Sequence, residues 1–236
     1  MMRRRTMSHA LVALTCFSVF SYAPLAAEDN VAPEGFEALF NGINMNGWEG
    51  LVGDPVKRAQ MKPKNLDKEI ARETARQLKH WTVSDGVMHY DGMGTSLTTE
   101  KEYGDFELLI DWKIEKNGDS GIYLRGSPQV QIWDPSLEIA AGVGSGGLYN
   151  NQKNPNKALK KADKPIGEWN TFRIKMIGEK VTVYLNDELV VDNVTMENYW
   201  ERDKPIYPRG KIELQHHGDP LQFKNIYIRE IKAGEK

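Results

Sequence analysis

Three short segments of the sequence carry polar and aromatic side chains at every second position. In chain order they contribute Tyr123 and Arg125, then Gln131 and Trp133, and finally Glu213, Gln215 and His217. If the intervening apolar residues face a core, period-two alternation in a strand directs these side chains to the opposite surface. Aromatic rings beside amides and a guanidinium suit a sugar, whose CH faces are apolar and whose rim carries hydroxyls. An ordinary solvated sheet face fits the same pattern, so that alternative stays open.

His217 is the residue of this set best suited to proton transfer, because an imidazole titrates near neutral pH. It belongs to the pair His216-His217, the only adjacent histidines among the five in the sequence. Neighbouring residues of a strand point to opposite faces, so this pair is poorly placed to bind one metal ion together. The pattern favours His217 as a general base.

The elements that must position these residues have the pattern of short antiparallel strands. Phe106 to Ile114 alternates apolar and polar residues, broken only by Leu109, and Phe172 to Met176 alternates again. Val181–Leu185 and Leu189–Val191 flank Asn186-Asp187-Glu188 as a hairpin. Many short strands at hairpin spacing predict an all-β fold of two packed antiparallel sheets. We expect a jelly-roll sandwich of the concanavalin or laminin-G type rather than a barrel.

One segment departs from the strand pattern. Asp54-Pro55 offers a helix N-cap with proline at the first helical position. Between Leu66 and Trp81, apolar residues recur near helical spacing among Lys, Arg and Glu. The sequence therefore predicts a helical insertion over residues 54–80, in which no residue suggests chemistry.

The N-terminus has the order of features of a secretory signal peptide. Arg3, Arg4 and Arg5 precede an apolar run from Ala10 to Phe20, which is too short to favour a retained membrane anchor. Small residues then follow, and we place cleavage after Ala27. This predicts a signal peptide over residues 1–27, a single sandwich domain over residues 28–236, and a periplasmic or secreted protein that leaves the membrane once it is cleaved.

Composition excludes several classes of function. The formal net charge is −2, with 31 basic and 33 acidic residues, which gives no electrostatic reason to expect nucleic acid or an anionic membrane as partner. The single cysteine, Cys16, lies in the predicted leader, so the mature chain has neither disulfides nor thiol catalysis. The paired-carboxylate strand Glu-x-Asp-x-x-Glu is absent, which disfavours direct glycoside hydrolysis.

Several motifs in order along the chain carry a resemblance to a known family. They are Phe40-Asn41-Gly42, Trp81-Thr82-Val83-Ser84-Asp85-Gly86, Tyr103-Gly104-Asp105-Phe106-Glu107, Asp119-Ser120-Gly121-Ile122-Tyr123-Leu124-Arg125, Gln129-Val130-Gln131-Ile132-Trp133-Asp134, Gly147-Leu148-Tyr149, Gly167-Glu168-Trp169-Asn170, Leu214-Gln215-His216-His217-Gly218 and Phe223-Lys224-Asn225-Ile226. Through them the chain resembles the 3-keto-disaccharide hydrolase domain family, whose members are also described as 3-keto-glucoside 1,2-lyases and 3-keto-2-hydroxy-glucal hydratases.

The resemblance implies a concanavalin-like jelly roll and a keto-sugar substrate. This sequence departs from the family's pattern at three positions: Gln129 stands where members often have Glu, Asp119 where they have Asn, and Asp187 where they have Gly. The first departure argues against a catalytic carboxylate on that strand.

The expected activity is cleavage of a glycoside already oxidised at C3. The ketone acidifies the C2 hydrogen, so a base can remove it and the C1 substituent then leaves. We expect His217 to be the base, Arg125 or a bound divalent cation to stabilise the enolate, and Asp134 to serve as acid or metal ligand. Tyr123, Gln131, Trp133, Tyr149, Trp169 and Gln215 are expected to orient the sugar.

A metal, if one is bound, is expected on Asp134, Glu213 and His217, although their spacing matches no standard motif. No other cofactor is expected. The alternative function is a non-catalytic, lectin-like carbohydrate-binding module, since the same fold serves both roles.

Overall fold

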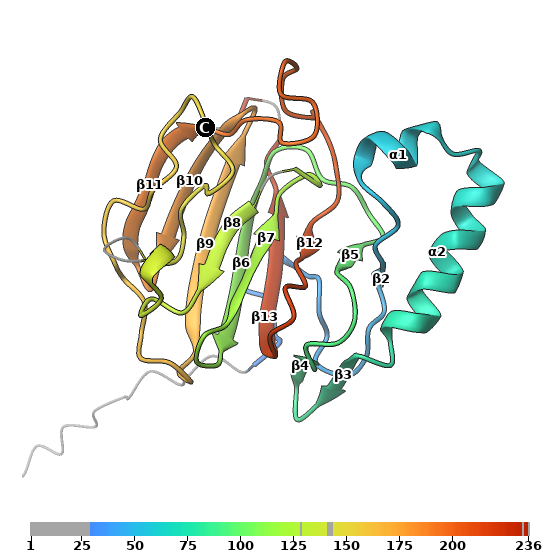
Figure 1. The fold of residues 1–236 in the computed structure, drawn as a ribbon, viewed down its shortest axis with the longest axis horizontal. Coiled ribbons are helices and arrows are strands. Elements are labelled where there is room, and N and C mark those ends of the chain that lie inside the picture. The colour runs from blue at the N-terminus through green and yellow to red at the C-terminus, as the bar shows by residue number, and fades with distance from the viewer. Residues whose placement is uncertain (1–28, 128, 141–143, 233, 236) are drawn as a thin grey trace, which may run out of the picture.

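The computed structural model describes residues 29–235 apart from 128, 141–143 and 233, so the expected signal peptide lies outside the described residues. Two antiparallel sheets pack face to face (Figure 1). The larger has the order β11 (Glu188–Thr195), β10 (Lys180–Leu185), β9 (Asn170–Ile177), β6 (Phe106–Ile114), β13 (Leu221–Glu230), β4 (Val87–Tyr90) and β3 (Trp81–Ser84), with β1 (Glu37–Ala38) also pairing β13. The smaller has the order β2 (Trp48–Gly50), β5 (Leu97–Thr99), β12 (Glu213–Leu214), β7 (Asp119–Tyr123) and β8 (Gln129–Trp133). The expected jelly-roll sandwich is confirmed.

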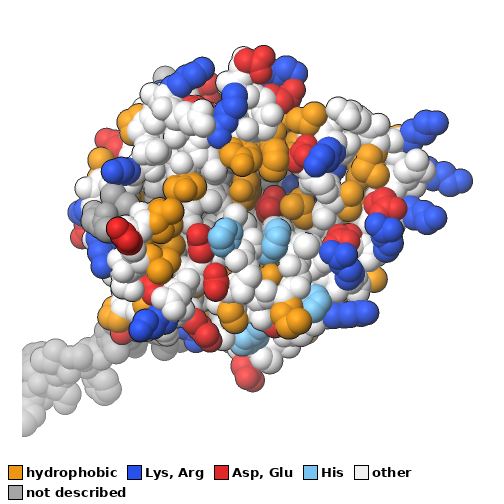
Figure 2. All heavy atoms as spheres, in the orientation of Figure 1, with side chains coloured by type: hydrophobic (Ala, Val, Ile, Leu, Met, Phe, Trp, Pro, Cys, Tyr) orange, Lys and Arg blue, Asp and Glu red, His pale blue; other side chains and the backbone are white. Residues whose placement is uncertain are grey.

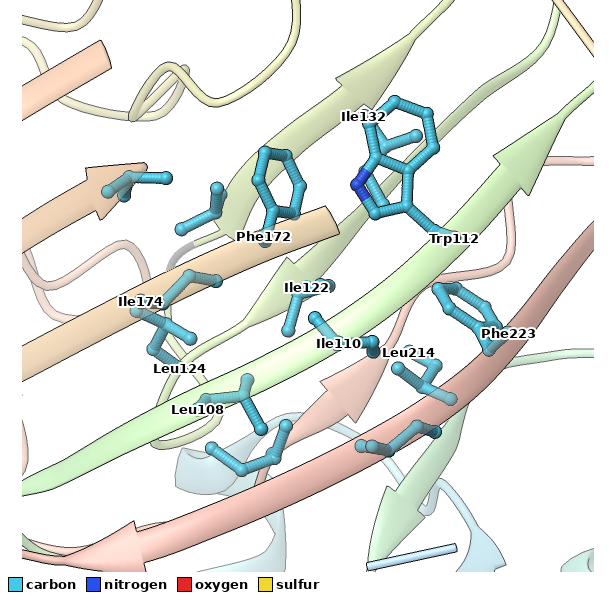
Figure 3. Packing of buried hydrophobic residues seen from close by; sticks show 14 of the residues in the cluster. Leu108, Ile110, Trp112, Ile122, Leu124, Ile132, Phe172, Ile174, Leu214 and Phe223 are labelled. Carbon is cyan, nitrogen blue, oxygen red and sulfur yellow. The ribbon is translucent and has the colours of Figure 1, made fainter. Parts of the chain in front are cut away.

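The core lies between the two sheets and follows the predicted alternation. Along β6, Leu108, Ile110 and Trp112 are at most 1% exposed and point toward the smaller sheet. Figure 3 shows them meeting Ile122 of β7 and Leu214 of β12 across the sandwich. Each side chain fully buried in this way contributes roughly 1.5–3 kcal/mol of transfer free energy, which fixes the register of the strands that carry the polar side chains.

The outer face of the smaller sheet is covered rather than solvated. All five residues of β8 are buried, including Gln129 and Gln131 at 4% and 2% exposure, and Glu213 of β12 is only 7% exposed. A solvated sheet face would leave every second residue open to water. These polar side chains therefore lie under other parts of the chain.

The helical insertion lies along one edge of this sheet. It forms α1 (Pro55–Gln60) and α2 (Pro63–Gln77), and α1 begins as predicted, with the Asp54 carboxylate accepting from the backbone N–H of Lys57 at 2.9 Å. In Figure 1 both helices lie beyond the β2 edge of the smaller sheet. The helix α2 contacts β2 closely, since the Gly50 N–H donates to the Thr74 hydroxyl at 2.9 Å and a Cβ on Gly50 would lie 2.6 Å from the α2 backbone.

The two-residue connection Met61-Lys62 leads into Pro63, the first residue of α2, whose ring presets the helical φ angle. The far end of α2 is held by Gln77, whose side chain is fully buried and accepts from the Thr95 N–H. Within the described part of the chain, no helix is long and apolar enough to cross a membrane.

Candidate active site

The short strand β12 and the residue that follows it place two of the expected site residues on the outer face. Ile212 and Leu214 are fully buried in the core, so Glu213 and Gln215 project to the other side, as their parity predicts. In the antiparallel pairing of β12 with β7, Glu213 lies opposite Tyr123. The same pairing extends to Gln215, whose N–H donates to the Gly121 carbonyl at 2.9 Å.

Beyond Gln215 the strand leaves the regular ladder. As a result both histidines that follow lie at the surface, whereas strict alternation would bury His216. The backbone N–H of His216 donates to the Ser96 hydroxyl at 3.2 Å, and its side chain stays on the same face as Glu213.

His217 faces a carboxylate on the neighbouring strand. Its Nδ1 lies 3.8 Å from Oδ2 of Asp119, and the imidazole is about half exposed. The other Asp119 oxygen accepts from the Gln131 amide at 2.6 Å, and the Asp119 N–H donates to Asp219 at 3.1 Å. Burial raises the pKa of Asp119 and Asp219 adds to that rise, while His217 and Gln131 oppose it. The arrangement places an imidazole beside a carboxylate of the neighbouring strand.

Glu213 is a second ionisable group suited to proton transfer. Burial raises its pKa to about 7, while a hydrogen bond from Ser96 and the positive charge of Arg58 act against that rise. The Ser96 hydroxyl also lies 2.9 Å from Nδ1 of His216. Burial also lowers the pKa of His216, with the neighbouring His217 as a smaller cause. Ser96 thus connects a carboxyl group that titrates near neutrality to an imidazole favoured in its neutral form.

Two amide oxygens on this face lack hydrogen-bond partners in the protein. They belong to Gln129 and Gln215, and both atoms are buried. The Gln129 oxygen lies over Gly121, where a Cβ would come within 2.5 Å of it, so only glycine fits beneath. The Gln129 amide nitrogen already donates to Gln131 at 2.7 Å. An unpaired buried acceptor costs roughly 1–3 kcal/mol, so these two oxygens favour a ligand that brings hydroxyl donors.

The face is hollowed by a cleft of about 560 Å³ between the sheet and the helical insertion. From the sheet side its walls include Ser96, Tyr123, Glu213, Gln215 and His216. Figure 2, drawn in the orientation of Figure 1, shows histidine and carboxylate side chains gathered on this face beside apolar ones. The volume lies within the range of small-molecule sites, about 300–1,000 Å³.

A second, smaller hollow of about 100 Å³ lies toward β8, on the far side of Asp119. Trp133 and Tyr149 line it, their rings edge to face with centroids 5.6 Å apart. The Trp133 indole N–H donates to the Gly144 carbonyl at 2.6 Å and only 5% of the side chain is exposed, whereas Tyr149 is 46% exposed. Gln131 belongs to this hollow and contacts Asp119, so the Asp119–His217 pair lies between the two hollows.

Comparison with known proteins identifies the family of this chain. Residues 35–229 match the model of the 3-keto-alpha-glucoside-1,2-lyase-like domain. The chain belongs to this family. It is 24% identical to a 3-keto-disaccharide hydrolase of Bacteroides thetaiotaomicron, in an alignment that covers 85% of this chain and 80% of the relative.

Two solved structures are also similar to this chain. A crystal structure from Parabacteroides distasonis, provisionally described as a glycosyl hydrolase, is 25% identical, covers 87% of this chain and all of its own, and superposes with a TM-score of 0.62. A second protein of the same description and organism is 23% identical, with a TM-score of 0.63 over 89% of this chain and 94% of its own. The latter supports the fold.

Within this lyase-like domain, Arg125 does not lie on the outer face, which corrects its expected position. Its φ angle of +55° ends the alternation after Tyr123 and turns the side chain inward, where it is 2% exposed. The guanidinium pairs with Asp105 at 2.7 Å and donates to the carbonyls of Gly104 and Gly178, each at 2.8 Å. These contacts occupy its donors in stabilising the fold, so Arg125 is not placed to stabilise an enolate on this face.

Asp134 and Trp169 also lie away from the two hollows. Asp134 is fully buried and its oxygens accept from the backbone N–H groups of Asn117 and Ser136, at 2.8 and 2.7 Å, so it caps a turn. Trp169 lies against Lys113 and Lys224 of the larger sheet, each 5.0 Å from its ring.

The three residues named as metal ligands are not brought together, because Asp134 lies in its turn apart from Glu213 and His217. Among the residues described, no group of three or more His, Cys, Asp or Glu side chains is arranged to hold a metal ion.

Sequence reasoning missed part of the site. Ser96 sits in a segment without a recognisable pattern, and Trp200 lies in a loop distant in sequence from the sheet, yet both line the cleft. The sequence also gives no sign that the helical insertion lies at the cleft, yet residues of α1 and α2 form one of its walls. An aromatic pair such as Tyr199-Trp200 in a polar loop was the one available signal.

Proposed function

We propose that this protein is an exported enzyme that cleaves 3-keto-glycosides by C2-proton abstraction and 1,2-elimination, with or without hydration of the product. The observation that carries the proposal is the presence, along one short strand segment, of an imidazole beside a carboxylate and a buried carboxyl group with a pKa near 7. An elimination needs one group to accept a proton and another to donate one, and groups titrating near the working pH serve best.

His217 acts as the base in this scheme. The ketone at C3 acidifies the C2 hydrogen, and the imidazole accepts that proton while the C2–H electrons form an enolate. The imidazolium that results lies next to the Asp119 carboxylate, 3.8 Å away, which stabilises the charge. The developing negative charge on the C3 oxygen requires hydrogen-bond donors fixed in advance. Tyr123 is suited to that task, since burial raises the pKa of its hydroxyl and keeps it protonated.

Glu213 acts as the acid. As the enolate collapses, a double bond forms between C1 and C2 and the bond from C1 to the leaving oxygen breaks. The protonated carboxyl group gives its proton to that oxygen, so the leaving group departs as a neutral alcohol. Water can then add across the double bond, with hydroxyl at C1 and hydrogen at C2, which makes the net reaction a hydrolysis. The oxygen of Gln215, which lines the cleft, would accept from a sugar hydroxyl.

The relatives support a carbohydrate substrate of this class, because one of them is named a 3-keto-disaccharide hydrolase. The test is to incubate the protein with 3-keto-glucosides of both anomers and follow ultraviolet absorbance of the enone. In deuterium oxide the product should carry deuterium at C2, and ordinary glycosides, whose C2 hydrogen is not acidic, should not react. Equal cleavage of ordinary and 3-keto-glucosides would reject the elimination. Binding without turnover, unchanged in His217→Ala, would instead indicate a lectin-like module.

Export rests on the leader-like sequence over residues 1–27. It is tested by N-terminal sequencing of the protein from periplasm and medium, which should begin near Glu28. Recovery only from the cytoplasm with Met1 retained would contradict it.

A further inference from the structure

Glu213, the proposed acid, is poorly placed to recover the proton that it gives to the leaving group. Its side chain is only 7% exposed, and it lines the cleft in which the products lie. Water that adds to the double bond in place would return a proton to Glu213, but release of the unsaturated sugar would not. Each turnover that ends in release therefore needs a route for a proton from solvent to a carboxylate covered by product.

A series of side chains connects Glu213 to the surface. The Ser96 hydroxyl is hydrogen-bonded to the Glu213 carboxyl group and lies 2.9 Å from Nδ1 of His216. Ser96 is 1% exposed, whereas His216 is exposed. An imidazole can take up a proton at one ring nitrogen and release one from the other. The three side chains thus form a path that is buried at Glu213 and reaches solvent at His216.

The directions of these hydrogen bonds depend on whether Glu213 carries its proton. The backbone N–H of His216 donates to the Ser96 oxygen at 3.2 Å, which leaves one lone pair and the hydroxyl hydrogen for the other two groups. With Glu213 ionised, Ser96 donates to the carboxylate and accepts from the Nδ1–H of His216. With Glu213 protonated, the carboxyl group donates to Ser96, and Ser96 donates to an unprotonated Nδ1. Passage of one proton along the path converts the first pattern into the second.

Burial sets the direction in which a proton moves along this path. Burial raises the pKa of Glu213 to about 7, against the effects of Ser96 and of the positive charge of Arg58 on α1. Burial also lowers the pKa of His216, and the neighbouring His217 lowers it further. A proton that His216 takes from water is therefore more stable on Glu213.

The other carboxylates of the cleft are already engaged by donors. Oε1 of Glu73 accepts from the Gln77 amide at 2.6 Å and pairs with Arg76 at 2.9 Å. Glu69 pairs with another arginine of α2, and Asp54 caps the first turn of α1. Among the acidic residues that line the cleft, Glu213 is the one joined to an exposed imidazole through a hydroxyl group.

We propose that Ser96 and His216 form a proton relay that returns a proton to Glu213 after each elimination. The proposal rests on the proposed function and adds the step that completes its cycle. Nε2 of His216 takes a proton from water, Nδ1 passes its proton to Ser96, and Ser96 passes its hydrogen to the Glu213 carboxylate. One proton enters at the surface and one arrives at Glu213, while the half-exposed His217 gives the C2 proton to solvent. Ser96 and His216 act through Glu213 and not on the reacting atoms.

The test separates the first turnover from those that follow. The substrate is methyl 3-keto-glucoside, whose methoxide leaving group needs protonation. In stopped-flow measurements at about pH 6.5, where much of Glu213 starts protonated, His216→Ala and Ser96→Ala should form the first equivalent of enone at nearly the wild-type rate. Later turnovers should slow by about tenfold, less than the roughly 10²–10⁴-fold loss expected without the acid itself.

Added imidazole distinguishes a relay from a structural role. It should restore the later turnovers of His216→Ala, since it can occupy the space left by the ring, but not those of Ser96→Ala, where the link to Glu213 is missing. The double variant should be no slower than either single variant, because both changes interrupt one path. His89→Ala is the matched control: it removes the imidazole of a second serine–histidine pair, with Ser84 Oγ 3.0 Å from His89 Nε2 on the larger sheet, and should leave both phases unchanged.

Three results would overturn the relay: later turnovers at the wild-type rate in both variants, a first turnover slowed as much as the later ones, or no rescue of His216→Ala by imidazole. Wild-type protein that forms no enone from the keto-glucoside would instead reject the proposed function. That result is distinct from the loss of the later turnovers alone.

Discussion

Nδ1 of His217 lies 3.8 Å from Oδ2 of Asp119, across the boundary between two strands that are far apart in the sequence. The contact exists because Gln215 remains paired with Gly121. In an antiparallel pair, this brings His217, two residues after Gln215, opposite Asp119, two residues before Gly121. Asp119 is fixed on its other side by the Gln131 amide, so the carboxylate is oriented before any substrate arrives.

His217→Ala should therefore lower kcat for 3-keto-glycosides by roughly 10²–10⁴-fold, the range usual for loss of a general base. Asp119→Asn should cause a smaller loss, because the base remains but the imidazolium loses its neighbouring charge. Steady-state kinetics with enone detection measures both. His89→Ala, a change on β4 of the other sheet, serves as control. A His217→Ala enzyme with wild-type kcat would remove this residue from the mechanism.

The pKa of Glu213, raised by burial to about 7, predicts the alkaline side of the activity profile. A general acid works only while it is protonated, so the rate of disaccharide cleavage should decline above about pH 7. Well above this pH the rate should fall about tenfold for each pH unit. Glu213→Gln should be slower and should lose this decline. Nitrophenyl 3-keto-glucosides, whose leaving group needs little protonation, should depend less on Glu213. If Glu213→Gln keeps the same alkaline decline, another group must be the acid.

The same raised pKa makes a prediction about stability. Between the unfolded pKa near 4.5 and the folded pKa near 7, the folded state holds a proton that the unfolded state has lost, so stability falls as pH rises. Glu213→Gln removes this dependence. Its free energy of unfolding relative to wild type should rise between pH 4.5 and pH 7, by roughly 3 kcal/mol for a shift of this size. Urea titrations at several pH values measure it, with exposed Glu188→Gln as control. A constant difference across this range would contradict the burial of an ionisable Glu213.

Arg125 should affect stability rather than chemistry. Arg125→Ala leaves the carbonyls of Gly104 and Gly178 without donors, and an unsatisfied buried acceptor costs roughly 1–3 kcal/mol. Denaturant unfolding should show this loss, whereas Lys160→Ala, at an exposed pair with Glu188, should cost at most about 1 kcal/mol. The kcat of folded Arg125→Ala should equal that of wild type. A selective loss of kcat without loss of stability would return Arg125 to the active site.

Much of the fold can be predicted from the sequence. In a long strand with one buried face, apolar residues recur at every second position, and this pattern is easy to recognise. Phe106–Ile114 is found with its predicted bounds, and the 54–80 insertion contains the two helices of which one begins at the predicted cap. The strands β2 to β5 are not recognised, since each has only three or four residues, too few for a period to show.

The candidate site was less predictable, for reasons that lie in single residues. Parity correctly places Glu213 and Gln215 but fails at Arg125, where a positive φ angle reverses the direction of the side chain. Parity does not predict the position of Asp134, because its carboxylate accepts hydrogen bonds from backbone N–H groups of a local turn. Ser96 and Trp200 join the cleft only through tertiary packing, which no local pattern encodes.

The order of strands has a consequence for how the chain acquires its structure. The strand β12 lies between β5 and β7, and β13 lies between β6 and β4, so the last strands to be synthesised occupy the interior of both sheets. Until they arrive, the four neighbouring strands present unpaired edges, and pairing them spans long stretches of chain, which is slow. A protein exported as proposed would thus emerge without a completed sandwich, and its translocation would not have to unfold one. The late pairing of β12 and β13 delays activity, and it also leaves the chain unfolded enough to be translocated.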